Sequence, residues 1–143
     1  MGMTIDRRAY RQLSRSQPQG LFVLQDQKLL PAAVAHLNVG LALSDRLKGF
    51  RSDLRCERVE SEFLSLINDS CKELILDRVD ILFDASWHLD VPRLLLKAGR
   101  NKRLFLVWPG TVRDSVLQYA ESTADDYAVY DVSKYVDTYI VTK

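Results

Sequence analysis

Two residues have the types and positions needed for nucleotide chemistry. Asp77 directly follows the apolar run 73–76 (ELIL), and Lys28 lies four residues beyond the apolar run 21–24 (LFVL). Each run is typical of a buried strand in a parallel sheet, and ligands gather at the carboxyl ends of such strands. A carboxylate there can hold Mg²⁺ on a nucleotide, and a lysine can reach phosphate oxygens. Asp77 and Lys28 therefore form the first candidate site.

The segment after residue 24 lacks the features of a phosphate-binding loop. Such a loop has the pattern GxxxxGK[ST], because glycines let backbone N–H groups surround the phosphates and the hydroxyl holds Mg²⁺. Here the segment reads QDQKLLPAA: it contains no glycine, and Leu29 replaces the hydroxyl residue. Asp26 adds negative charge where phosphates would lie. We expect no ordinary ATP binding and interpret Asp77 as a turn or capping acid, with Mg²⁺–ATP as the alternative.

The remaining reactive residues form no recognisable catalytic or metal pattern. Cys56, Cys71, His36 and His88 lack metal-ligand spacing, and no nucleophile or zinc-protease signature is present. The sequence therefore predicts no catalytic residue, no metal site and no required cofactor.

Arginines crowd the first segment, which reads as a helix over residues 4–16 with Thr4 as its cap. They are Arg7, Arg8, Arg11 and Arg15. A solvated basic face is the favoured interpretation, and a surface for nucleic acid or an acidic partner protein is the alternative. A second basic set surrounds a later helix and could extend that surface: Arg93, Lys97, Arg100, Lys102 and Arg103.

Length and composition are typical of one soluble globular domain. The chain has 143 residues, of which 47% are hydrophobic and 27% are charged. A net charge of +1 favours no class of partner. No apolar run reaches the roughly 20 residues of a spanning helix, and the first residues lack a signal-peptide core. We expect a cytoplasmic protein with no membrane partner.

Helical and strand patterns alternate along the chain. Helices are expected at 4–16, 29–37, 57–69 and from 91, and strands at 21–24, 38–43, 73–76, 104–108, 127–132 and 139–141. Residues 44–50 fit a helical turn, and 112–119 are ambiguous. Such alternation predicts a single α/β domain over residues 1–143, with a three-layer sandwich around a mostly parallel sheet.

Several short motifs in the second half occur in a recognisable order. They are ILFD at 81–84, DVPRLL at 90–95, GRN at 99–101, WPG at 108–110, QYAE at 118–121 and YAVYD at 127–131. Together they resemble BrxF, the family of small P-loop proteins of type 3 BREX phage-defence systems. The resemblance extends over roughly the last two-thirds of the chain.

The resemblance implies a P-loop-NTPase-like core with Asp77 at the Walker B position and Asn101 near a sensor position. The family is expected to bind ATP through a glycine-rich loop, which this chain lacks. A degenerate member would be a non-catalytic or weakly catalytic adaptor that docks on other proteins of the defence system. The alternatives are an active ATP-binding subunit and a nucleic-acid-binding module that uses the arginine helix. The oligomeric state stays open.

Overall fold

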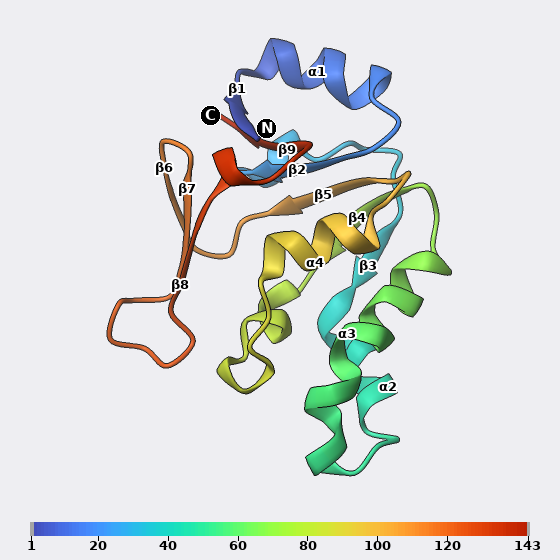
Figure 1. Cartoon of the computed structure of the whole chain (residues 1–143). Helices are drawn as coiled ribbons and strands as arrows, with labels where there is room; N and C mark the ends of the chain where they lie inside the picture. The colour runs from blue at the N-terminus through green and yellow to red at the C-terminus, as the bar shows by residue number, and fades with distance from the viewer. Residues whose placement is uncertain (1, 143) are drawn as a thin grey trace.

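The six strands of the main sheet are all parallel and follow the order β1-β9-β2-β5-β4-β3 (Figure 1). The computed structural model describes residues 2–142. The strands are β1 (Met3–Ile5), β2 (Gly20–Leu24), β3 (His36–Asn38), β4 (Glu73–Asp77), β5 (Arg103–Val107) and β9 (Thr138–Val141). The expectation of a mostly parallel sheet is confirmed.

Helices cover both faces of this sheet, so the domain has three layers (Figure 1). One face carries α1 (Arg7–Ser16), and the other carries α2 (Val39–Leu47), α3 (Ser52–Asn68) and α4 (Val91–Ala98). Alternate residues of β2 enter the two apolar clusters: Leu21 packs with the α2–α4 side, and Phe22 packs with the α1 side. The predicted three-layer sandwich is confirmed.

Short polar side chains cap the first turns of α1 and α4. The Asp6 carboxylate accepts a hydrogen bond from the Ala9 N–H at 2.7 Å, which starts α1. The Asp90 carboxylate accepts one from the Arg93 N–H at 3.2 Å, with Pro92 in the first turn of α4. Such caps satisfy N–H groups that have no partner inside the helix. The expectation for α4 is confirmed.

Two expected elements between β2 and α3 are wrong. Residues 29–37 contain no α-helix: the three-residue turn η1 (Gln27–Leu29) is followed by bends and a turn over residues 30–34 and then by β3. The expected strand 38–43 is mostly helix, because the Asn38 side chain accepts a hydrogen bond from the Leu41 N–H at 3.0 Å and starts α2. Val39 and Leu43 are both buried, and they are four residues apart. Residues at this spacing share a face in a helix and also in a strand. The two periods agree at these positions, so apolar spacing was a poor guide.

The N-terminal part of the chain also differs from expectation. The N-terminal helix starts at Arg7 and not at residue 4, because residues 3–5 form β1 beside β9. The basic helix therefore follows the first strand of the sheet instead of preceding it. The strand expected at 139–141 is confirmed as β9, which lies between β1 and β2 with all four residues buried.

A small antiparallel sheet follows β5. Its strands are β6 (Thr111–Arg113), β7 (Val116–Tyr119) and β8 (Ala128–Asp131). The Tyr119 ring stacks on Phe83 with centroids 3.9 Å apart, and the Trp108 indole N–H donates to the Gln118 carbonyl at 2.9 Å. The first contact attaches the small sheet to the short turn η2 (Val79–Phe83), and the second attaches it to the residue after β5. Two other short turns are η3 (Ala85–Trp87) and η4 (Val132–Lys134).

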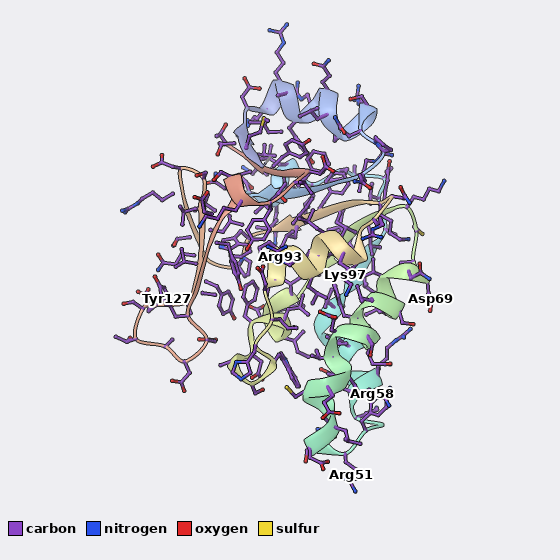
Figure 2. The ribbon with its side chains drawn as sticks, in the orientation of Figure 1. Arg51, Arg58, Asp69, Arg93, Lys97 and Tyr127 are labelled. Carbon is purple, nitrogen blue, oxygen red and sulfur yellow. The ribbon has the colours of Figure 1, made fainter. Side chains whose placement is uncertain are left out.

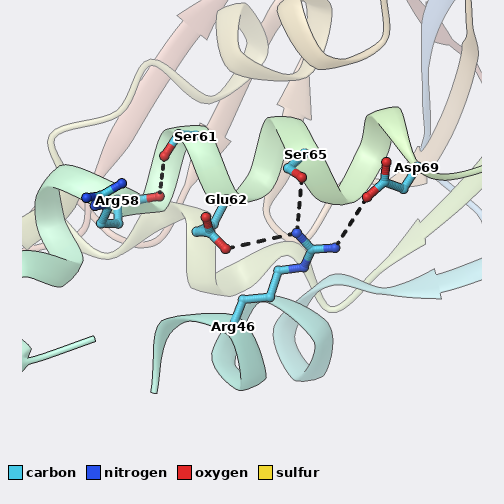
Figure 3. Close-up of polar contacts among 6 residues, drawn as sticks. All are labelled: Arg46, Arg58, Ser61, Glu62, Ser65 and Asp69. Atoms are coloured by element: carbon cyan, nitrogen blue, oxygen red, sulfur yellow. Dashed lines mark hydrogen bonds and ion pairs between the residues drawn. The ribbon is translucent and has the colours of Figure 1, made fainter. Parts of the chain in front are cut away.

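A polar cluster on the outer surface joins α2 to α3 (Figure 3). The Arg46 guanidinium donates to the Ser65 hydroxyl at 3.2 Å and lies 4.0 Å from the Glu62 carboxylate. Its other terminal nitrogen lies 3.7 Å from the Asp69 carboxylate. One side chain of α2 thus contacts three side chains along the last turns of α3. Within residues 2–142, helix length and hydropathy do not suffice for crossing a membrane.

Candidate functional site

Asp77 ends β4 at the carboxyl edge of the sheet, as its sequence position predicts. Its carboxylate Oδ2 lies 2.8 Å from Nδ1 of His36, which belongs to the neighbouring strand β3. Both side chains are about half-exposed, 43% for Asp77 and 54% for His36. The sequence offered no signal for this pair, because the two residues are 41 positions apart.

The segment after β2 has no phosphate-binding geometry. The Asp26 carboxylate accepts a hydrogen bond from the Lys28 N–H at 2.9 Å, so one local N–H group is already bonded to a protein anion. The turn that follows has only three residues and does not lead into an α-helix. Leu30 and Val34 then pack against the apolar cluster under α1. The segment packs over one face of the sheet and does not form a phosphate-binding loop at the end of β2.

Lys28 and Asp77 are not brought together as one site. Lys28 lines a groove beside α1, and the described part of that groove does not include Asp77. Asn101, the expected sensor, lies before β5, at the amino edge of the sheet, where its N–H donates to the Gln19 side chain at 3.0 Å. Asp77 ends its strand at the opposite edge, so Asn101 cannot serve a nucleotide at the strand carboxyl ends.

The groove between α1 and the 28–31 segment does bring several predicted residues together. It has a volume of about 580 Å³, and its charged lining residues are Arg7, Arg11, Arg15, Lys28, Glu73 and Arg103. We call it the α1 groove. Three of the four predicted arginines line it, and Arg8 does not, although Arg8 is also exposed. Lys28 was predicted for a different reason, as a phosphate ligand of a nucleotide site.

Sequence reasoning included Arg103 in the second basic set but missed Glu73 and the contacts that these two residues make at the base of the α1 groove. Arg103 forms an ion pair with Glu73 of the adjacent strand, and its Nη1 donates to the Ser14 carbonyl at 2.9 Å and the Arg15 carbonyl at 3.3 Å. The last carbonyls of a helix have no intrahelical partner, so a cation stabilises them. Arg103 opens β5 directly, and a charged residue at the start of a buried strand was the available signal.

Tyr10 joins the two walls of the α1 groove. Its hydroxyl donates to the Leu29 carbonyl at 2.8 Å, which ties α1 to the segment after β2. Its ring packs against Phe22 and Phe105 with centroids 5.7 and 6.4 Å away. Burial raises the pKa of Tyr10 to about 12. The groove therefore has a neutral, rigid floor beneath its basic rim.

The second basic set lies on the other side of the molecule. Figure 2 shows Arg93 and Lys97 on α4, across the sheet from α1. Arg93 is paired with Asp90 at 3.5 Å, and Lys97 with Glu60 at 3.3 Å. The Lys102 ammonium donates to the Ser70 carbonyl at 2.8 Å. Of this set only Arg103 reaches the α1 groove, so the two sets form no continuous surface.

An acidic hollow lies beside the small sheet. It is lined by Asp80, Asp84, Asp125 and Asp126, with Ile81 and Ala85. Hydrogen bonds from Ser86 lower the pKa of Asp84. The Tyr119 hydroxyl donates to Asp80 at 3.2 Å, and partial burial together with that carboxylate raises the pKa of Tyr119 to about 12. Over residues 2–142, no three histidine, cysteine or acidic side chains converge as metal ligands.

Comparisons with family models, with curated proteins and with solved structures found no match to this chain. The candidate sites therefore rest on their own geometry and chemistry.

Proposed function

We propose that this chain is a non-catalytic or weakly catalytic accessory subunit with a P-loop-like core, which acts as a protein-interaction adaptor in the bacterial cytoplasm. One observation carries the proposal: a parallel sheet with an acid at the end of β4 is combined with a segment after β2 that cannot hold phosphates. The resemblance to BrxF over roughly the last two-thirds of the chain supports a role in a BREX-type phage-defence system, with other proteins of that system as the proposed partners.

The geometry after β2 disfavours the alternative of an active ATPase. A triphosphate needs several backbone N–H donors and a helix N-terminus aimed at it. Here Asp26 accepts from the Lys28 N–H, and the carboxylate would repel a phosphate at that point. The Lys28 side chain lies in the α1 groove, away from the Asp77 carboxylate that would hold Mg²⁺. The two parts of an ATP site are thus separated.

Calorimetric titration of the chain with Mg²⁺–ATP tests the loss of the nucleotide site. We expect no saturable heat at ATP concentrations up to the millimolar range, and the same trace for Asp77→Ala. Micromolar binding that Asp77→Ala abolishes would overturn the non-catalytic assignment and support the ATPase alternative.

Recovery of bound proteins from the native host tests the adaptor role separately. We expect the tagged chain to retain a protein encoded beside it, such as a methyltransferase, a PglZ-like phosphatase or a large ATPase. If purification under mild salt recovers no product of a neighbouring gene, the adaptor and BREX assignments both fail.

A further inference from the structure

We propose that the α1 groove binds the sugar–phosphate backbone of a single-stranded nucleic acid, without reading its sequence. This inference goes beyond the adaptor function, because it assigns a ligand to a surface that the adaptor proposal does not use. It also does not depend on an ATP site, since the groove lies beside α1 and excludes Asp77.

The charge of the α1 groove is strongly one-sided. Its lining carries five cations and one acid, Glu73, and that acid is already paired with Arg103. The four remaining cations are Arg7, Arg11, Arg15 and Lys28. Among the ion pairs formed within residues 2–142, none involves these four side chains. A polyanion that enters the groove therefore meets four cations that are not held in an ion pair. The Asp26 carboxylate accepts from the Lys28 backbone N–H at 2.9 Å but does not line the groove.

The spacing of the arginines fits a repeating phosphate chain. Arg7, Arg11 and Arg15 are successive i,i+4 positions of α1, which places them about 6 Å apart along the helix axis. An extended single strand presents one phosphate per nucleotide at a similar interval. Each planar guanidinium can also donate two parallel hydrogen bonds to one phosphate. A row of three such groups can therefore follow three successive phosphates.

Lys28 extends the row onto the opposite wall. It belongs to the segment after β2, which Tyr10 ties to α1 through the Leu29 carbonyl at 2.8 Å. The cations thus face the hollow from two sides, as in a channel that follows a single strand. A rigid duplex would touch only the rim of a groove of about 580 Å³.

The floor of the groove explains why base identity would not be read. Tyr10 and Phe105 are only 7% and 2% exposed, and their rings pack against each other and against Phe22. No ring face is left for base stacking on these two residues, which is the usual sequence-tolerant contact of single-strand binders. Contacts to phosphate position a strand and carry no sequence information.

Fluorescence anisotropy with a labelled 20-nucleotide oligothymidylate tests the inference. If four cations contact phosphates, the logarithm of the association constant should fall with the logarithm of salt concentration at a slope of about −3. Arg11→Ala should reduce that slope to about −2 and weaken binding about fivefold at low salt. Lys28→Ala should act similarly.

Arg8→Ala is the matched control, because it removes the same charge from the same exposed helix but from outside the groove. It should change the dissociation constant less than twofold, and far-ultraviolet circular dichroism should show equal helix content in all variants. Equal weakening by Arg8→Ala and Arg11→Ala would overturn the groove as the site. No salt-dependent binding at all would overturn the proposal.

Two further ligands test the class of polyanion. Duplex DNA of equal length should bind several-fold more weakly than the single strand, and equal affinity would overturn the single-strand assignment. A labelled polyglutamate peptide should bind weakly with no response to Arg11→Ala. If the peptide binds as tightly as the oligonucleotide and responds to the same variants, the groove takes an acidic protein segment and the nucleic-acid assignment is wrong.

Discussion

At the scale of single residues, Tyr10 holds the α1 groove together. It is 7% exposed, and its hydroxyl makes the hydrogen bond that ties α1 to Leu29. Burial disfavours the charged form of the side chain, and this raises the pKa of Tyr10 to about 12 from an ordinary value near 10. The same hydrogen bond thus holds the two walls of the groove together and contributes to the stability of the domain.

We expect Tyr10→Phe to lower the free energy of unfolding by about 1 kcal/mol at neutral pH, because the Leu29 carbonyl loses its donor. Ionisation adds a pH dependence. The pKa of Tyr10 is raised in the folded state, so its contribution is complete below about pH 10 and is lost as pH rises toward 12. The wild type should therefore lose more stability between pH 9 and pH 11 than Tyr10→Phe does.

Urea unfolding followed by circular dichroism at pH 7, 9 and 11 measures both effects. Tyr127→Phe is the control, since Tyr127 is 40% exposed on the loop before β8. Equal pH dependence in the wild type and in Tyr10→Phe would contradict the assigned role of the buried hydroxyl.

At the scale of elements, the contact between α2 and α3 depends on one side chain as well as on apolar packing. Val39, Leu43 and Leu47 bury the inner face of α2. On the outside, Arg46 contacts Ser65 at 3.2 Å and Asp69 at 3.7 Å (Figure 3). Exposed ion pairs contribute little one at a time, but Arg46 is only 32% exposed and serves several partners at once.

We expect Arg46→Met to lower the free energy of unfolding by about 1 kcal/mol, because methionine keeps much of the aliphatic stem and removes the polar contacts. Arg51→Met is the matched control. Arg51 is 77% exposed and pairs only with Asp53, two residues away, so its replacement should cost less than about 0.3 kcal/mol. Thermal unfolding of the two variants compares them directly. Equal destabilisation would show that the contact of Arg46 with α3 adds nothing.

At the scale of the whole molecule, the two sheets share one apolar core. Phe83 belongs to η2 beside the main sheet, and it stacks on Tyr119 of β7 with an angle of 4° between the rings. Trp108 contacts Phe83 edge-on at 5.4 Å, and Leu117 of β7 is 1% exposed within the larger apolar cluster. The small sheet therefore has no separate core of its own.

We expect one cooperative unfolding transition, as the prediction of a single domain requires. The chain has two tryptophans: Trp108 belongs to the apolar cluster on the α2–α4 side of the sheet, and Trp87 packs against that cluster. Tryptophan fluorescence thus reports on that region, while far-ultraviolet circular dichroism reports on the helices. The two urea midpoints should coincide. Phe83→Ala should lower the free energy of unfolding by about 3 kcal/mol or more and should move both midpoints together. Separate midpoints would indicate two units.

The candidate site was only partly predictable from the chain. Residue types alone predicted that α1 is basic and that the segment after β2 is not a phosphate-binding loop. The α1 groove could not be predicted, because Arg11, Lys28 and Arg103 are far apart in the sequence. They come together only when α1 and the segment after β2 pack on the sheet face beside β5. The pairing of Asp77 with His36 was hidden for the same reason.

The sequence by itself determined the α/β class, since short apolar runs such as β2 and β5 alternate with capped amphipathic helices such as α4. Only the tertiary structure decided strand β1 and the 25–43 region. β1 has three residues and becomes a strand because β9 supplies hydrogen bonds along its length. The segment after β2 is an irregular series of turns, and Leu30 and Val34 in it cover one apolar face of the sheet. The local propensities of these residues cannot predict their conformations, because the surfaces on which they pack exist only after the sheet has formed.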